Sequence, residues 1–260
     1  MRKYWIILKN QIGLVSTYRI DLLTRWVMNS FDVIVNVALW SLVTGGDQQQ
    51  INKLILYFTL YYGILNNIHT GRAANWISRD ILNGDINHYL IKPIYFPLVQ
   101  VIKSSTIIIV RVLVPLLILI VGSFLYPSVF APIGLTNLIL CLTFVFLGAI
   151  IWNTMVISFS TISFLGTETG QFFTALDLMI NLLKGAYIPA YLFSPYVTRL
   201  LSFTFIPYLA SFPIRLYQEV VSPTEIFQAF FVASAWAVFF TFTATYFYRR
   251  GLKIYEAQGS

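Results

Sequence analysis

Long apolar stretches, separated by short polar connectors, dominate the hydropathy pattern of this 260-residue chain. About 20 mostly apolar residues, with a range of about 17–25, cross the hydrocarbon core of a bilayer as a helix. Six stretches fall in or near that range: residues 26–43, 54–70, 98–122, 135–157, 172–192 and 226–247. The pattern therefore predicts an all-α integral membrane protein with six transmembrane helices, forming a single domain over residues 1–260.

Three segments outside these spans have patterns of their own. In residues 1–25, Trp5, Leu8 and Ile12 recur near helical spacing, which predicts an N-terminal interfacial helix; the alternative is an extension of the first span. Residues 71–97 form a long polar connector. Residues 193–225 hold a short apolar run broken by Pro207, with further prolines around it, which predicts an outer re-entrant helical hairpin.

Composition and charge agree with a membrane location. The chain is 58% hydrophobic and only 10% charged, which is too little charge to cover a water-facing surface and excludes a soluble globular domain. Most of its 17 Lys and Arg residues lie before the first span, in or beside residues 71–97, and after the last span. By the positive-inside bias, both termini and the 71–97 connector are predicted to be cytoplasmic.

Polar residues inside the spans form two helical stripes. A charged side chain deep in a bilayer costs on the order of 2.5–3.5 kcal/mol, so such stripes are not expected to face lipid. We interpret them as a translocation path or a dimer interface. The alternative is structural, with Asp32 and Asp177 pairing with each other or with Arg111 inside the third span. The stripes are Arg25, Asn29, Asp32 and Asn36 in the first span, and Thr174, Asp177, Asn181 and Lys184 in the fifth.

Motifs of soluble enzymes are missing from the sequence. It contains no phosphate-binding loop G-x-x-x-x-G-K-[ST], no G-x-S-x-G and no H-E-x-x-H. The two histidines, His69 and His88, have no metal-ligand spacing, and Asp85 with His88 is read as a solvated pair rather than a catalytic one. We therefore expect no catalytic residue, no metal and no cofactor in this chain.

The connector at 71–97 predicts a compact surface for protein contact. Residues 72–83, RAANWISRDILN, have an amphipathic helical pattern, and Gly84 is placed to end that helix in a left-handed conformation. Asp85 is expected to cap the following turn, which Lys92 and Pro93 end. Exposed Trp76, Tyr89 and Leu90 would form the contact surface. The alternative is that the same aromatic residues anchor the connector to the membrane surface.

Two motifs carry a resemblance to a known family. The connector "NGDINHYLIKPI" is similar to a Gly-[Asp/Thr]-x-x-x-Tyr-Leu-x-[Arg/Lys]-Pro pattern, and the tail "YRRGLKIYEAQGS" is similar to a basic-Gly-Leu-Lys/Arg-x-Tyr-Glu-x-x-Gly pattern. With six spans, the chain resembles the permease subunits of bacterial ABC type-2 exporters, closest to the viologen-exporter-like branch. The matching residues are Gly84, Asp85, Tyr89, Leu90, Lys92 and Pro93, then Arg250, Gly251, Leu252, Lys253, Tyr255, Glu256 and Gly259.

The resemblance implies a mechanism and partners. A permease of this kind pairs with a second permease, a copy of itself or a related chain, and docks two ABC ATPase subunits that bind ATP and Mg. The coupling residues would be Trp76, Ile77, Asp80, Ile81, Gly84, Asp85, Tyr89, Leu90, Lys92 and Pro93. The first and fifth spans, with Asn29, Asp32, Asn36, Thr174, Asp177, Asn181 and Lys184, and also Arg111, would line the path or the dimer interface.

The expected activity is ATP-driven efflux across the bacterial cytoplasmic membrane, with no nucleic-acid partner. The chain is rich in aromatic residues, 22 Phe, 16 Tyr and 6 Trp, and the acids Asp32 and Asp177 lie within its spans. Cation–π contacts and a counter-charge favour an amphiphilic, cationic, drug-like substrate. The alternatives are a channel or membrane scaffold without ATP-driven transport, and a lipid-modifying membrane enzyme.

Overall fold

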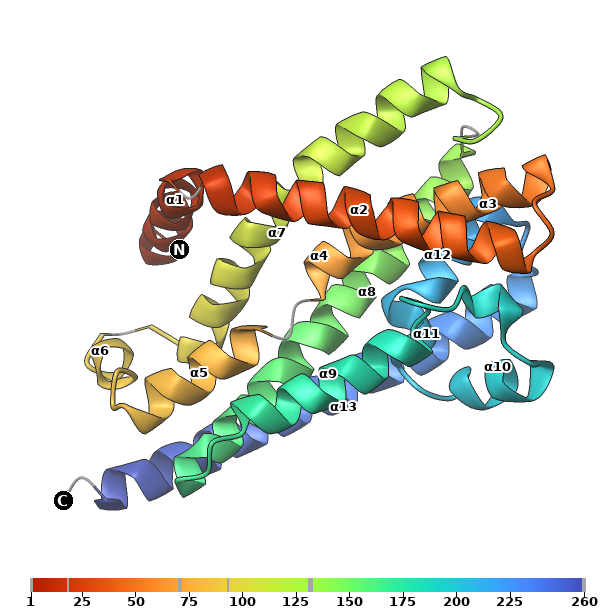
Figure 1. Ribbon diagram of the computed structural model, residues 1–260. Helices are drawn as coiled ribbons and strands as arrows, with labels where there is room; N and C mark the ends of the chain where they lie inside the picture. Colours follow the sequence, from red (N-terminus) through yellow and green to blue (C-terminus); the bar gives the residue numbers. More distant parts are fainter. Residues whose placement is uncertain (1, 18, 70–71, 93, 131–132, 259–260) are drawn as a thin grey trace.

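The computed structural model describes residues 2–17, 19–69, 72–92, 94–130 and 133–258, and within these ranges every regular element is a helix (Figure 1). The first half holds α1 (Arg2–Thr17), α2 (Arg19–Val43), α3 (Gln48–Phe58), η1 (Thr59–Leu65), α4 (Asn66–Ile68), α5 (Arg72–Leu82), α6 (Asn87–Leu90) and α7 (Phe96–Leu125). The second half holds α8 (Leu135–Ser160), η2 (Thr161–Leu165), α9 (Gly170–Leu183), η3 (Ala190–Leu192), α10 (Pro195–Leu201), α11 (Ile206–Leu209), α12 (Ser211–Gln218) and α13 (Pro223–Gln258).

Four helices of the described chain are long and apolar enough to cross a membrane, and they coincide with the first, third, fourth and sixth predicted spans. They cover Ile20–Val43, Phe96–Leu125, Leu135–Leu165 and Pro223–Tyr255. The second predicted span corresponds to the consecutive helical segments α3, η1 and α4, many of whose side chains are buried inside the protein. The fifth corresponds to α9. A count of six spans stays a prediction.

The bounds of α2 and α9 differ from the prediction in ways that change the architecture. α2 begins at Arg19 instead of residue 26, so the helix that precedes it, α1, is shorter than the predicted 1–25. α9 has only 14 residues and ends at Leu183 instead of residue 192. It ends there because Gly185 adopts a positive φ of 98° and Pro189 follows, a combination that does not continue an α-helix. The α9 helix is therefore about 21 Å long, shorter than the hydrocarbon core.

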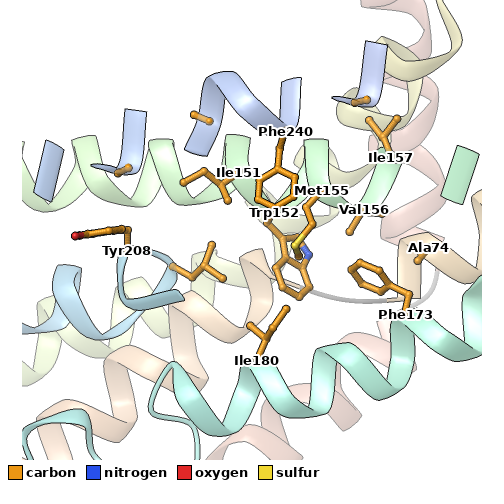
Figure 2. Packing of buried hydrophobic residues seen from close by; sticks show 14 of the residues in the cluster. Ala74, Ile151, Trp152, Met155, Val156, Ile157, Phe173, Ile180, Tyr208 and Phe240 are labelled. Carbon is orange, nitrogen blue, oxygen red and sulfur yellow. The ribbon is translucent and has the colours of Figure 1, made fainter. Parts of the chain in front are cut away.

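Close packing of α13 against α8 forms the larger core. In lipid, helices associate mainly through van der Waals fit, which small residues improve by letting two backbones approach. Ala229, Ala233 and Ala237 recur every four residues along the buried face of α13 and are 3%, 0% and 8% exposed. Figure 2 shows Trp152 of α8 among side chains from α9 and α13, including Phe173, Ile180 and Phe240.

A second core lies where η1 packs against α2 and α7. η1 is a π-helical segment inside an otherwise α-helical run, and such segments occur frequently at functional sites. Gly63 lets α7 approach it, since a Cβ atom at this position would lie 3.1 Å from the Cβ atom of Pro115. This core is built mainly of aromatic and leucine side chains from α3 and η1.

Short helices occupy the predicted re-entrant region. α10, α11 and α12 lie between α9 and α13 in the chain, and both α11 and α12 pack against α8. Ser194 caps α10 by accepting a hydrogen bond from the Val197 backbone N–H at 3.4 Å. Phe212 and Leu216 of α12 are buried in the main core. The short helices are present; their position in the membrane stays a prediction.

The alanine stripe on α13 is expected to tolerate no larger side chain. Ala233→Leu should lower stability by about 1–3 kcal/mol, because the added atoms enter a filled contact with the rest of the subunit. Thermal unfolding of the detergent-solubilised protein, followed by size-exclusion chromatography, would measure the loss. Ala235→Leu on the exposed face of α13 is the matched control. Equal unfolding temperatures for the two variants would contradict the close packing described here.

Candidate functional site

The α5 helix presents one face to the protein and one face outward. Ala74, Ile77 and Ile81 are 1–2% exposed, and α5 packs against α8, α9 and η2. Polar contacts fix it further: Ser78 Oγ lies 2.6 Å from Ser163 Oγ, and Asn75 Nδ2 donates to Thr174 Oγ1 at 3.4 Å. Apolar and polar contacts thus both fix α5 against α8 and α9.

Gly84 ends α5 as the sequence predicts. Its φ is +80°, a conformation that glycine adopts without strain. The predicted capping role of Asp85 is wrong: the N-cap position of α6 is Ile86, and no side chain caps that turn. Instead, the fully buried Ile86 anchors α6, and its backbone N–H donates to the Asp80 carbonyl at 2.9 Å. Pro93 lies outside the described residues.

The two motifs that carry the family resemblance meet in space. A Cβ atom at Gly84 would lie 3.5 Å from the Tyr255 hydroxyl, although the two residues are 171 positions apart in the sequence. The Tyr255 ring makes an edge contact with Phe164 at 5.8 Å, and a side chain at Gly251 would collide with the same phenylalanine. The tail of α13 is thus packed beside the connector that follows α5.

Exposed side chains at this end form a surface, which we call the α5–α6 surface and define by Trp76, Arg79, Leu90 and Ile91. Trp76 and Ile91 are 53% and 80% exposed. A hollow of about 390 Å³ lies beside it, between α5 and the start of α9, lined by Asn75, Trp76, Arg79, Glu168, Gln171 and Thr174. Tryptophan and arginine are both enriched in protein–protein interfaces, so Trp76 and Arg79 together suit a protein contact.

Two predicted coupling residues are more enclosed than the sequence suggests. Tyr89 is half-buried: its hydroxyl accepts a hydrogen bond from Lys103 Nζ at 2.7 Å, and its ring packs against Phe96. Burial raises the pKa of the Asp80 carboxyl. The positive charge of Lys103 opposes this shift, and the negative charge of Asp85 adds to it. Tyr89 and Asp80 therefore support the α5–α6 surface rather than extend from it, whereas Asp85 and Lys92 are exposed.

The stripe on α2 has few contacts inside the subunit. Asn29 and Asp32 are partly exposed, and no residue in the most apolar 18-residue stretch of this helix is buried. Arg25 and Arg111 both face Asp21, at 2.8 Å and 4.0 Å. Asp21, at the start of α2, is therefore an ion-pair partner of Arg111, and the predicted alternative of a pair with Asp32 or Asp177 stays a prediction.

A tyrosine pair links this stripe to the one on α9. Asn36 Nδ2 lies 3.3 Å from Tyr62 Oη, and Tyr61 Oη donates to Asn181 Oδ1 at 3.2 Å. Asn181 Nδ2 in turn donates to Asp177 Oδ1 at 2.9 Å. Tyr61 and Tyr62 lie in η1, and sequence reasoning missed them. Their adjacent positions in an otherwise apolar span were the available signal.

The α2 and α9 helices approach each other at one end only. Trp40 Nε1 donates to the Tyr187 carbonyl at 2.7 Å, which joins the end of α2 to the segment after α9. Figure 1 shows the two helices separating toward the end where α1 and α5 lie. Thr174, near the start of α9, contacts Asn75 of α5, whereas Asn181 and Asn36 both reach the tyrosine pair.

Two buried polar side chains meet at Trp152. Lys184 is 0% exposed, and its Nζ lies 5.2 Å from the Trp152 ring and 5.8 Å from the Tyr61 ring without a hydrogen-bond partner in the described protein. The His69 ring contacts the same tryptophan at 5.6 Å. Lys184 also terminates α9, where the negative end of the helix dipole favours a cation. Lys184 therefore lies at the end of α9 and inside the core.

Charged residues cluster beside a second, larger hollow. It has a volume of about 870 Å³ and lies among α10, α11, α12 and the start of α13. Arg215 binds Glu225 with two hydrogen bonds and Glu219 Oε2 at 3.3 Å, while Lys53 Nζ donates to Glu219 Oε1 at 2.7 Å. These contacts tie α3, α12 and α13 together.

No group of three His, Cys, Asp or Glu residues in the described part of the chain is placed to hold a metal ion. The polar sites are instead the α5–α6 surface, the paired stripes and the charged cluster.

The long apolar helices and these sites define a multi-pass helical membrane protein. Residues 26–259 match the sequence profile described as ABC-2 family transporter protein. Because the match covers most of the sequence, the chain belongs to the ABC-2 transporter family and is a permease, a transport component rather than a catalytic one. Permeases of this family generally work with ABC ATPase subunits. No curated protein and no solved structure shows significant similarity to the chain.

The charged cluster makes stability depend on pH. Burial alone would raise the pKa of Glu219, but the hydrogen bonds and positive charges of Lys53 and Arg215 outweigh it and hold the pKa below its usual value. Because the folded-state pKa is lowered, this contribution is present above the unfolded pKa of about 4.3 and is lost as the pH falls through the folded-state pKa.

Glu219→Gln should therefore cost about 1 kcal/mol near neutral pH and weaken the loss of stability on acidification. Unfolding temperatures measured from about pH 7 to pH 3.5 would show both effects. Glu168→Gln, at an exposed carboxylate with no ion pair among the described side chains, is the control and should keep the full pH dependence. An unchanged pH profile in Glu219→Gln would contradict the assignment.

Proposed function

We propose that this chain is the membrane-spanning half of an ATP-driven exporter in a bacterial cytoplasmic membrane, in the viologen-exporter-like branch of the family. Family membership supports the transporter class, and the two motifs that meet at Gly84 and Tyr255 support the branch. The observation that carries the proposal is the α5–α6 surface: α5 is buried on one face, while Trp76 is exposed on the other.

The α5–α6 surface docks an ATPase subunit. Its apolar and charged side chains, and the hollow beside Trp76, suit insertion into a cleft of a partner. Because α5 contacts α8, α9 and η2, a push on its outer face moves the helices that carry the main core. Both termini and this surface face the cytoplasm, in accord with the positive-inside distribution of Lys and Arg.

A second permease, the same chain or a related one, covers the exposed faces of α2 and α9. Both helices carry exposed apolar side chains, among them Phe31, Ile34, Leu178 and Met179. Both also carry half-exposed polar ones, which lipid would disfavour and a polar partner or a hydrated path would accept. The polar chain from Asn36 through Tyr62 and Tyr61 to Asn181 and Asp177 lies between them, and its two buried tyrosines support that path from inside the subunit.

The substrate is an amphiphilic, cationic compound. Asp32 has no ion-pair partner among the described side chains, so its charge is available to a ligand, and Tyr61 and Tyr62 lie near the same stripe. Carboxylates and aromatic faces together favour organic cations.

Loss of the exposed apolar side chains on the α5–α6 surface should release the ATPase. Trp76→Ala with Leu90→Ala should reduce the co-purified ATPase subunit at least tenfold, because a central tryptophan often carries 2 kcal/mol or more of binding free energy. Affinity purification followed by quantitative mass spectrometry measures the ratio of the two chains. The matched control is Trp5→Ala with Ile6→Ala on α1, where both side chains are also exposed. Equal ATPase recovery in both variants would favour a channel or scaffold.

Neutralising the acids of the two stripes should weaken export without disrupting assembly. Asp32→Asn and Asp177→Asn are expected to reduce ATP-dependent uptake of a lipophilic cation into inverted vesicles about three- to tenfold, since each removes one counter-charge. Asp47→Asn, at an exposed position before α3, is the control. Normal transport by both acid variants would make these carboxylates structural.

A further inference from the structure

The C-terminal part of α13 carries a basic face that the transport proposal does not use. Arg249, Arg250 and Lys253 surround a hollow of about 510 Å³ together with Phe242, Thr245 and Tyr246. These six positions are spaced by three or four residues, or are adjacent, so they share one side of the helix. None of the three cations has an ion pair among the side chains that the structure describes, so the described part of this face carries three positive charges.

This face points away from the rest of the subunit. The opposite side of the same helical segment is covered: Tyr248 is 4% exposed and stacks on Phe96 at 6.1 Å, Gly251 lies against Phe164, and Tyr255 contacts Phe164. Phe242 is 68% exposed and Tyr246 is 46% exposed. The basic face is therefore continuous with the apolar surface that α13 presents to lipid.

The length of α13 places this face at the level of lipid headgroups. With 36 residues, the helix is about 54 Å long, whereas about 20 residues cross the hydrocarbon core. At its other end, Glu225 forms an ion pair with Arg215. Because charged side chains are unfavourable in hydrocarbon, we place the start of the hydrocarbon core after Glu225. About 20 residues further along lies Tyr246, at the depth where aromatic side chains favour the interface. Arg249, Arg250 and Lys253 follow within the headgroup layer.

We propose that the basic face binds an anionic phospholipid. The lipid phosphate lies among the guanidinium groups of Arg249 and Arg250 and the Lys253 ammonium, and an acyl chain packs along Phe242 and Tyr246. Arginine and lysine suit a phosphate, and their positive charge matches an anionic lipid but not a zwitterionic one. Arg250 is already oriented, because its Nη1 donates to the Tyr246 hydroxyl at 2.9 Å. This site does not depend on how the transport cycle proceeds.

The test is native mass spectrometry of the purified full-length chain, with the partners it retains, titrated with phosphatidylglycerol or with phosphatidylethanolamine carrying the same acyl chains. Phosphatidylglycerol should bind more tightly, and a variant with Arg249→Gln, Arg250→Gln and Lys253→Gln should lose that preference. We expect roughly a fivefold loss in affinity for each cation removed. The preference should also fall as salt is raised.

A control variant removes two exposed cations elsewhere, with Lys9→Gln and Arg199→Gln, and should keep the preference that Arg249→Gln with Arg250→Gln weakens. Equal losses in these two double variants would show a general charge effect and overturn the site. Displacement of the lipid by excess inorganic phosphate would show a free-anion site instead. Unchanged lipid binding with less co-purified ATPase would make this face a protein interface. The single Arg249→Gln variant, expected to lose about fivefold, decides the matter if the triple variant does not fold.

Discussion

The close approach of α13 to α8 is the contact on which the other elements of this subunit depend. In a bilayer, burying an apolar side chain against protein instead of lipid gains little, so helices are held by shape and by polar contacts. The alanines of α13 supply the shape, and the neighbouring core around Trp152 receives α5, α9, α11 and α12. α5 is thereby held in contact with the helices that any partner at its surface would have to move.

The long helices were predictable because their signal is strong and local. Stretches such as 98–122 and 226–247 are apolar throughout, and the structure extends them only at the ends, where helices continue beyond the apolar residues. The end of α9 was not predictable from hydropathy, because residues 184–192 remain mostly apolar; the positive φ of Gly185 and the position of Pro189 decide it. Asp85 was assigned a capping role on residue type alone, whereas burial of Ile86 determines how that turn is held.

For the candidate site too, one part was predictable from the sequence and another part was not. Helical spacing alone identified the stripes on α2 and α9, since residues on one face of a helix follow from periodicity. Their connection could not be read from the sequence, because it runs through Tyr61 and Tyr62 in a π-helical segment, and the sequence pattern does not distinguish that segment from an α-helix. The contact between Gly84 and Tyr255 also joins residues far apart in the chain, and only the fold brings them together.

α13 is one continuous helix from Pro223 to Gln258. One end is fastened by the ion pair of Glu225 with Arg215, and the other lies beside Gly84 through Tyr255. With 36 residues, the helix is about 54 Å long. One continuous helix therefore joins the segment after α5 to the charged cluster, and no loop interrupts it.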